Sequence, residues 1–400
     1  MSRMPLGIYV SVPFCRTKCS YCNFASDVFS RAVFDRYVDR VCADIQSAPQ
    51  IATEIGGQFE RAVDSIYLGG GTPTVLEAAQ LERIFETLRR QFDISSGAEV
   101  TVECAPGTLT EVVIETLLRC GVNRVSLGVQ SFVDQEAAAV GRLHKRTAVL
   151  ADIDRLRNAG IANINIDLIA GLPHQTADSW KSSIAETIAT AAPHVSVYML
   201  EVDENSRLGS ELLAGGKRYH AHFVPDDDAM ADFYLDACDR LQSAAIAQYE
   251  ISNFAREGFE SKHNLKYWTR QPYFGFGVDA HSMLRSGTHD TESVRFPTSD
   301  SLEKYMREST LQRTAVSQAQ ALEESLFLGL RLSRGVNLRE LSGKFGGDVM
   351  SDVRATIAEF ITTGLIEPCG EKESVRLTRR GRLLSNEVFE KFLLMDKVVS

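Results

Sequence analysis

Three cysteines, Cys15, Cys19 and Cys22, follow one another at the spacing C-x-x-x-C-x-x-C within the stretch SVPFCRTKCSYCNFAS, residues 11–26. A structural zinc site uses four ligands, usually as two pairs separated by a dozen or more residues. A cysteine nucleophile needs one thiol and a base, and leaves the other two thiols unexplained. Three thiolates on a four-iron cube leave one iron open to an exogenous ligand. The spacing therefore favours an iron-sulfur cluster over a chance grouping or a zinc site completed by a distant residue.

The rest of the composition is that of an ordinary globular chain. Its 400 residues are 44% hydrophobic and 24% charged, enough for one large domain and a smaller one. The formal net charge of -10 argues against a nucleic-acid partner, because phosphate binding favours a basic face. The sequence shows no transmembrane segment and no signal peptide, and only three of its eight cysteines cluster. We therefore expect a cytoplasmic protein without a disulfide framework.

Six short runs rich in β-branched residues alternate with amphipathic helical stretches and predict buried parallel strands. The runs are GIYVSVP (7–13), SIYLGGG (65–71), EVTVECA (99–105), RVSLGVQ (124–130), NINIDLIAG (163–171) and HVSVYML (194–200). Helices are predicted between them, for example over residues 78–92 and 149–160. This alternation predicts an α/β fold in which a parallel sheet curls into a partial (β/α)6, TIM-like barrel.

Beyond residue 202 the pattern becomes less regular. Residues 249–282 are rich in aromatics, glycine and histidine, and we expect an edge strand and loops there. Residues 319–400 predict two helices, a strand-like wing and a last helix, which resembles a winged-helix topology. We predict three parts: the barrel over 1–250, a connecting segment over 251–318 and a smaller C-terminal winged-helix-like α+β domain over 319–400.

Glycines and polar residues gather where the predicted strands end, at Gly69 to Thr72, Glu103, Gln130 and Asp167. In parallel α/β sheets ligands bind at the carboxyl ends of the strands, so these residues predict one site. A buried carboxylate at Asp167 is costly unless paired, and we expect a partner such as Arg142 or a ligand hydroxyl. The structural alternatives are a plain glycine turn and a solvated Glu103.

Several motifs together resemble a known family. C-x-x-x-C-x-x-C after the first barrel strand is similar to the signature of the radical S-adenosylmethionine (SAM) enzymes. The stretches YLGGGTPT (67–74), VECAPGTLT (102–110), SLGVQSF (126–132), GRLH (141–144) and INIDLIAGLPHQT (164–176) resemble the SAM-site motifs of the oxygen-independent coproporphyrinogen III oxidase group. The resemblance covers nearly the whole chain. It implies a barrel of the radical SAM type, a 4Fe-4S cluster on Cys15, Cys19 and Cys22, and SAM bound to the open iron.

The same resemblance implies the residues of the SAM site. The expected SAM contacts are Gly70, Gly71, Thr72, Glu103, Gln130, Arg142 and Asp167, and the aromatic positions lining the same pocket are Tyr9 and Tyr21. Ordinary packing is the alternative for both tyrosines. The sequence departs from the family pattern at Cys104 in ECAPG, and at Ala170 and His174 in AGLPHQT, so details of the pocket are left open.

Two features separate the branches of this group. The decarboxylating oxidases typically carry a fourth cysteine two residues after the third, where this chain has Phe24. The HemW-type heme chaperones typically have phenylalanine there and add the motif H-N-x-x-Y-W, which stands here at residues 263–268. The resemblance implies heme contact by His263, with His281 as a second candidate. We expect His220 and His222 to be a surface pair.

The sequence therefore predicts a chaperone that binds heme and transfers it to an acceptor hemoprotein, for example a membrane-associated one. A 4Fe-4S cluster with exchangeable SAM would accompany the heme. The alternative is an enzyme, a radical SAM oxidase that decarboxylates coproporphyrinogen III. A radical SAM enzyme on an unrelated substrate is a third interpretation, and it explains none of the aromatic and histidine-rich segment.

Overall fold

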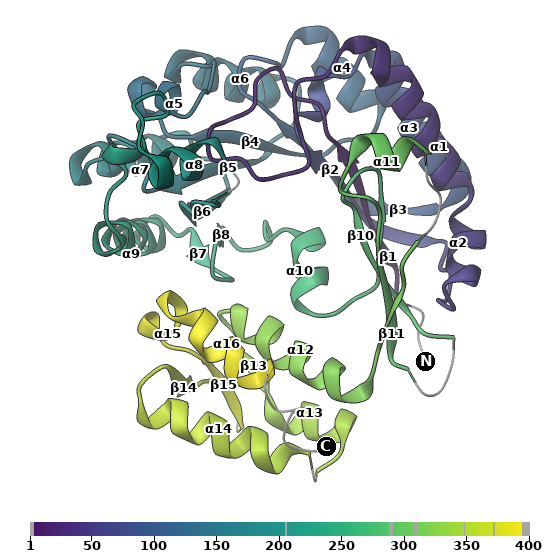
Figure 1. Cartoon of the computed structure of the whole chain (residues 1–400), viewed down its shortest axis with the longest axis vertical. Helices are drawn as coiled ribbons and strands as arrows, with labels where there is room; N and C mark the ends of the chain where they lie inside the picture. The colour runs from purple at the N-terminus through teal and green to yellow at the C-terminus, as the bar shows by residue number, and fades with distance from the viewer. Residues whose placement is uncertain are drawn as a thin grey trace.

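A computed structural model describes residues 4–204, 206–287, 291–307, 311–347, 349–370 and 373–393. Its centre is a run of six strands that neighbour one another in chain order and all pair in parallel. They are β1 (Leu6–Val12), β2 (Ala62–Gly70), β3 (Asp93–Cys104), β4 (Arg124–Gln130), β5 (Asn163–Ala170) and β6 (His194–Met199). The partial (β/α)6 barrel expected from the sequence is confirmed (Figure 1).

Helices cover the outer face of these strands (Figure 1). The α-helices are α1 (Phe34–Gln46), α2 (Ala48–Glu54), α3 (Ala78–Gln91), α4 (Glu111–Arg119), α5 (Asp134–Ala139), α6 (Arg146–Asn158), α7 (Ala177–Ala189), α8 (Arg207–Ala214) and α9 (Asp227–Ser243). Short 3-10 turns occupy η1 (Arg31–Val33), η2 (Pro73–Val75) and η3 (Ala221–Phe223). Helix α3 shows why they form: Leu81, Phe85 and Leu88 repeat at helical spacing and are buried against the sheet.

Further strands extend the sheet at both edges of the six parallel strands, so that the described sheet has twelve strands. On the β1 edge, β9 (Tyr273–Phe276) pairs in parallel, and β10 (His281–Arg285), β11 (Ser293–Pro297) and β12 (Thr314–Val316) follow antiparallel. On the β6 edge lie β8 (Asn253–Ala255) and β7 (Ala247–Gln248). The expectation of one edge strand with loops in 249–282 is wrong, because this stretch holds β8, β9 and the start of β10, and strands of three to five residues are too short to show a periodic pattern.

Two helices belong to the connecting segment over 251–318, α10 (Lys262–Trp268) and α11 (Leu302–Arg307). Helix α10 carries the H-N-x-x-Y-W motif and packs against β1 and β2 on one side and α12 on the other (Figure 1). Its first turn is held by Glu99, whose carboxylate accepts hydrogen bonds from the backbone amides of Lys262 and His263, both at 3.1 Å. The motif is therefore anchored to the base of strand β3.

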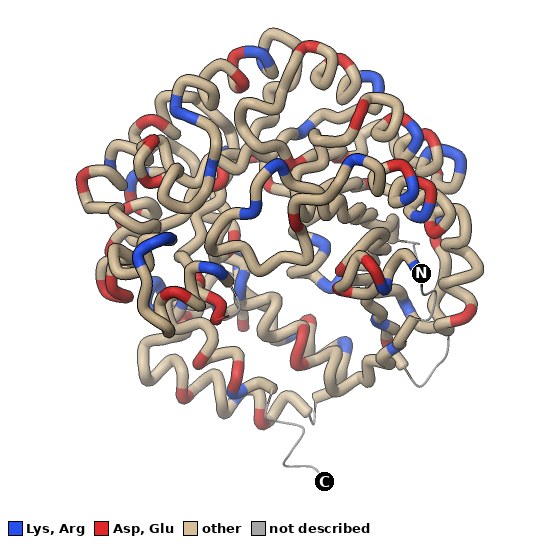
Figure 2. The backbone as a smooth tube through the Cα atoms, turned by 45° about the horizontal axis from the view of Figure 1, so that its top comes forward, with Lys and Arg blue, Asp and Glu red and all other residues tan. Residues whose placement is uncertain are grey.

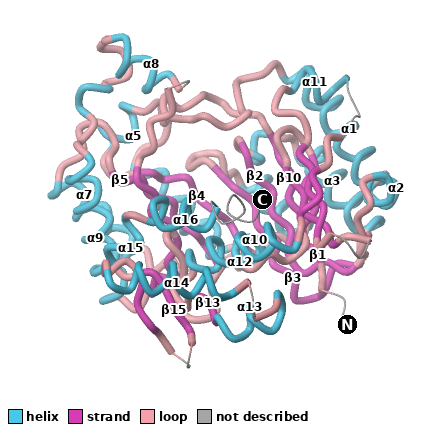
Figure 3. The backbone as a smooth tube through the Cα atoms, turned by 60° about the horizontal axis from the view of Figure 1, so that its bottom comes forward, coloured by secondary structure: helices cyan, strands magenta, loops and turns pink. Residues whose placement is uncertain are grey.

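The C-terminal part has its own small sheet and its own hydrophobic cluster. Its elements are α12 (Gln318–Arg331), β13 (Val336–Asn337), α13 (Leu338–Phe345), α14 (Met350–Thr362), β14 (Ile366–Pro368), β15 (Ser374–Leu377), α15 (Arg379–Leu383) and α16 (Ser385–Leu393). The antiparallel order β13-β15-β14 with these helices is the winged-helix-like arrangement expected. Figure 3 shows these helices in front of the barrel when the molecule is seen from below.

Ion pairs fix this C-terminal part to the barrel. Arg270, which follows α10 and has only 4% of its side chain exposed, contacts Glu324 of α12 at 2.8 Å and Glu292 at 2.9 Å. The guanidinium of Arg331 lies over the Trp268 ring at 4.4 Å from its centroid. Elsewhere acidic and basic residues are interspersed over the outer helices (Figure 2). The C-terminal part therefore holds α10 against the barrel.

Candidate functional site

The three cysteines lie on the loop that follows β1. Its base is closed by two backbone hydrogen bonds, from the Cys15 amide to the Asp27 carbonyl and from the Asp27 amide to the Pro13 carbonyl, both at 3.0 Å. All three thiols are free and half-buried. The Cys22 amide also donates to the Cys19 carbonyl at 3.3 Å. One short closed loop thus carries all three sulfur donors.

This donor set fits an iron-sulfur cluster. Within the described ranges, no group of three or more His, Cys, Asp and Glu side chains is arranged to hold a single metal ion. Hydroxyl groups flank the thiols: Thr72 Oγ1 lies 4.0 Å from Cys15 Sγ, and Ser26 Oγ lies 3.8 Å from Cys22 Sγ. Burial raises the pKa of the Cys15 thiol and so favours its protonated form. A metal cation bound to the sulfur would favour the thiolate instead. Three soft donors without a fourth suit a cluster better than tetrahedral zinc.

The glycine turn after β2 lies directly against this loop. The amides of Gly71 and Thr72 donate to the carbonyls of Val12 and Phe14, both at 2.8 Å. Gly70 has φ +100°, a conformation that favours glycine, and a Cβ on Gly71 would lie 2.7 Å from the Phe14 carbonyl oxygen. The positions of Gly70 and Gly71 therefore favour glycine, and the amides of Gly71 and Thr72 hold this turn against β1 and the start of the cysteine loop.

Glu103 ends β3 and points its carboxylate at the neighbouring strand. It accepts hydrogen bonds from the Tyr67 hydroxyl at 2.8 Å and from the Gly70 amide at 3.1 Å. Burial raises the pKa of Glu103 to about 7. Glu103 is half-buried and hydrogen-bonded to two partners, so its carboxylate is not freely solvated. The sequence reasoning missed Tyr67, although its place two residues before Gly69 on an alternating strand could have put it on the same face.

Asp167 on β5 is half-buried and hydrogen-bonded, but not with the expected partner. Its carboxylate accepts hydrogen bonds from Ser126 Oγ at 2.9 Å and Asn165 Nδ2 at 2.6 Å, and burial raises its pKa. The expected Arg142 instead donates to the Tyr21 hydroxyl at 2.9 Å. The expectation of a direct Arg142 partner is therefore wrong, because Ser126 on the neighbouring strand β4 and Asn165 on β5 itself occupy the carboxylate.

Gln130 and Arg142 come together over the end of β4. A Cβ on Gly128 would lie 3.1 Å from Gln130 Nε2 and 3.3 Å from an Arg142 guanidinium nitrogen. Gln130 itself has φ +68° and is buried. Together with the bond from Arg142 to Tyr21, this joins the β4 end to the cysteine loop. Of the predicted SAM-site residues, Tyr9 and Gly70 line one cavity, and Thr72 and Arg142 line another beside Cys19.

His263 lies in the interior of the barrel. Its side chain is 1% exposed, Nδ1 is 3.1 Å from Ser65 Oγ, and Nε2 is 2.8 Å from the Tyr267 hydroxyl. Burial, followed by the charge of Lys266, lowers the pKa of His263 to about 3. The imidazole is therefore neutral, and both of its nitrogens already have partners.

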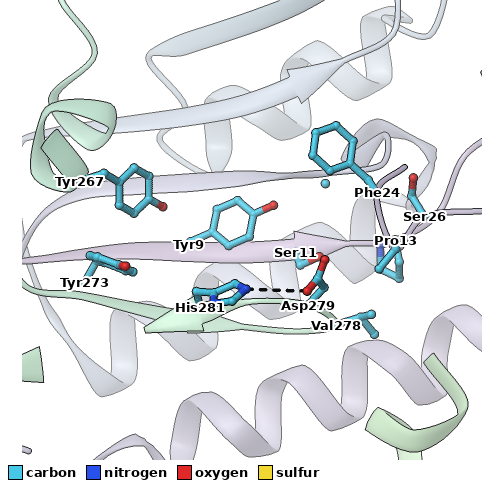
Figure 4. Close-up of a pocket in the computed structure, with 12 residues that line it drawn as sticks. Tyr9, Ser11, Pro13, Phe24, Ser26, Tyr267, Tyr273, Val278, Asp279 and His281 are labelled. Atoms are coloured by element: carbon cyan, nitrogen blue, oxygen red, sulfur yellow. Dashed lines mark ion pairs between the residues drawn. The ribbon is translucent and has the colours of Figure 1, made fainter. Parts of the chain in front are cut away.

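A cavity of about 320 Å³ opens beside His263, between the cysteine loop and α10 (Figure 4). Aromatic rings from distant parts of the chain form much of its wall: Phe24, Tyr9, Tyr267 and Tyr273. His281 and Asp279 also line it, with His281 Nε2 3.8 Å from Asp279 Oδ1.

His220 and His222 lie outside this cavity and have different surroundings. His220 Nδ1 lies 3.0 Å from His174 Nε2, whereas His222 is exposed.

The chain is similar in sequence to known proteins over nearly its whole length. Two family models match the chain, "Radical SAM superfamily" over residues 9–186 and "HemN C-terminal domain" over residues 316–384. The heme chaperone HemW of Lactococcus lactis is 34% identical over 99% of this chain and 99% of its own. The chain belongs to the HemW family. The HemW proteins of Bacillus subtilis and Escherichia coli are 34% and 30% identical, over 96% and 97% of this chain and 98% of each.

The resemblance to HemW proteins that the sequence motifs indicated is therefore confirmed. A solved structure, coproporphyrinogen III oxidase (HemN) from Escherichia coli, shares the fold at a TM-score of 0.80 and 23% identity, covering 97% of this chain and 90% of that one. Among the described residues, no helix is both long and apolar enough to cross a membrane. The radical SAM assignment implies a 4Fe-4S cluster and SAM, for which the loop and strand ends above supply fitting residues.

Proposed function

We propose that this protein binds a heme in the aromatic cavity and passes it to an acceptor hemoprotein. The observation that carries the proposal is the shared cavity wall: Phe24 comes from the cysteine loop and Tyr267 from the H-N-x-x-Y-W helix. These are the two features by which the sequence resembles the chaperone branch. Membership of the HemW family, whose relatives bear the name heme chaperone, supports the same function.

The cavity suits a flat apolar macrocycle. Tyr267 and Tyr273 pack edge to face with their centroids 4.6 Å apart, and Tyr9 stacks on Tyr67 at 6.1 Å. Such rings supply broad apolar surface in fixed orientations. Phe24 is 62% exposed in the absence of a ligand, so a bound porphyrin would cover apolar surface that otherwise faces water. An accessible site of this kind also suits a cargo that must leave again.

The cluster and SAM are assigned to the neighbouring residues. Cys15, Cys19 and Cys22 would hold a 4Fe-4S cluster, which when bound supplies an open iron for SAM and an electron for its reduction. The SAM site would comprise the strand-end residues Gly70, Gly71, Thr72, Glu103, Gln130, Arg142 and Asp167, with Tyr9 and Tyr21 beside them. The half-buried carboxylates of Glu103 and Asp167 offer hydrogen-bond acceptors for the amino and hydroxyl groups of SAM.

The hydrophobic clusters bear on how the chain divides into domains. Separate hydrophobic clusters, one reaching from Leu6 to Tyr305 and one from Leu322 to Phe392, support the division into a barrel with its connecting segment and a domain over 319–400. His263, buried below Tyr267, supports the wall of the heme cavity.

The cytoplasmic location and the membrane-associated acceptor stay predictions, which fractionation and crosslinking in cells would test.

An anaerobic heme titration of the cluster-reconstituted protein tests the proposal. We expect saturation near one heme per chain, followed by absorbance, and transfer of that heme to an apo-hemoprotein. The same preparation, given coproporphyrinogen III, SAM and a reductant, should form no decarboxylated porphyrin. Absence of saturable heme binding together with product formation would establish the oxidase alternative instead.

A further inference from the structure

The buried position of His263 bears on which residue can reach a heme iron. Both imidazole nitrogens are engaged, with Ser65 and Tyr267, and the side chain is 1% exposed. Direct ligation by His263 would break one of these hydrogen bonds and leave a hydroxyl group inside the protein without its partner, which is unfavourable. It would also need the Tyr267 ring to move out of the cavity wall.

His281 is differently placed. It begins strand β10, its side chain is 67% exposed, and it lines the same cavity as Phe24 and Tyr267. Figure 4 shows its ring beside Tyr9 and Tyr273, with Asp279 facing its Nε2 at 3.8 Å. Among the described residues, the His281 ring makes no hydrogen bond to a side chain or to the backbone. A nitrogen is therefore available without breaking any internal contact.

The turn that carries His281 is held rigidly. Gly277 has φ +94°, and a Cβ there would lie 2.5 Å from the Ser11 carbonyl oxygen of β1. A Cβ on Gly275 would overlap the His281 carbonyl. On the other side the Asp279 amide donates to the Ser299 carbonyl at 2.8 Å. The glycines of FGFGVDAHS therefore bring this turn against the end of β1, a fixed support of the kind that a ligand site needs.

We propose that His281 is the protein ligand of the heme iron in this cavity, and that His263 acts only through Tyr267. This inference rests on the proposed heme-binding function. One imidazole nitrogen donates its lone pair to form one Fe–N bond, and neither iron nor protein changes oxidation state. The proton on the other ring nitrogen faces Asp279, the carboxylate partner that commonly orients ligating histidines.

The test compares three alanine variants of the full-length, cluster-reconstituted protein: His281→Ala, His263→Ala and, as a matched exposed control, His222→Ala. Each is titrated with heme under anaerobic conditions, and the bound heme is characterised by absorbance and by electron paramagnetic resonance of its ferric form. We expect His281→Ala to weaken binding at least tenfold and to lose the signature of histidine ligation. Added imidazole should restore that signature. His263→Ala should keep the signature in whatever heme it binds, and the control should match native protein.

The outcomes separate the two proposals. If native protein binds one heme and His281→Ala keeps the native spectrum, His281 is not the ligand, while heme binding stands. Loss of the histidine signature in His263→Ala alone would assign the iron to His263 and overturn the inference. If native protein shows no saturable heme binding, the proposed function fails, and with it the inference that depends on it.

Discussion

In helix α10 the imidazole Nε2 of His263 and the hydroxyl of Tyr267 lie 2.8 Å apart, one helical turn from each other. The histidine is buried against β2, whereas the tyrosine lines the cavity. The spacing H-N-x-x-Y therefore couples a buried, neutral imidazole to an aromatic ring of the ligand site. His263 would therefore affect a bound ligand by fixing the position of the Tyr267 ring.

Removing this imidazole should destabilise the fold. His263→Ala leaves Ser65 Oγ and the Tyr267 hydroxyl without their partner inside the barrel. We expect the free energy of unfolding to fall by about 2–3 kcal/mol, measured by urea denaturation. His222→Ala, at an exposed position, should change it by less than about 0.5 kcal/mol. Equal stability of the two variants would contradict the described burial.

His263 should also make stability depend on pH. Burial lowers its pKa to about 3, compared with about 6.5 in an unfolded chain. Below pH ~6.5 the unfolded chain binds a proton that the folded chain does not, so this contribution to stability is lost as the pH falls. Between pH 6.5 and 5.5, the unfolding free energy of native protein should fall by about 1 kcal/mol more than that of His263→Gln. Parallel profiles would refute a neutral buried His263.

The close approach at Gly71 makes a prediction about the cluster. Alanine there would place a Cβ 2.7 Å from the Phe14 carbonyl, one residue before Cys15. We expect Gly71→Ala to displace the cysteine loop and to retain less than half of the native iron and sulfide after reconstitution. The control is Gly97→Ala, where a Cβ would meet nothing within 4 Å. Native iron content in Gly71→Ala would show that the loop is not held by this contact.

Glu103 should set the pH dependence of SAM binding. Burial raises its pKa to about 7, so the carboxylate is mostly protonated at pH 6 and mostly ionised at pH 8. If the ionised form binds the positively charged ligand, SAM affinity should rise about tenfold over that range. Calorimetric titrations of Glu103→Gln should give weaker and nearly pH-independent binding. A native pH profile in that variant would remove Glu103 from the site.

Much of the fold could be predicted from the sequence, because long periodic segments carry clear signals. The six parallel strands and helices such as α3 (Ala78–Gln91) lie within a few residues of their expected limits. Strand β3 begins six residues before its predicted start, at Asp93, because DISSGA is polar and exposed. The short strands β9 to β12 escaped prediction, since each is defined by its sheet partner.

The candidate site was predicted less completely than the fold. Motifs indicated which residues gather at the strand ends, yet they could not show that Tyr67 binds Glu103 or that Arg142 binds Tyr21. These pairings depend on side-chain direction in three dimensions. For the same reason the sequence ranked His263 above His281, although only His281 is exposed in the cavity. The domain limits and the roles of the individual site residues stay predictions.

The central claim is that heme occupies the cavity beside the cysteine loop, and a paired heme titration tests it most directly. Phe24→Ala removes an exposed ring from the cavity wall, whereas Phe223→Ala removes an exposed ring elsewhere, so neither change should disturb the core. We predict that native protein and Phe223→Ala each saturate near one heme per chain, and that Phe24→Ala binds about tenfold more weakly. Equal affinities in all three proteins, or no saturable binding in the native protein, would contradict the account.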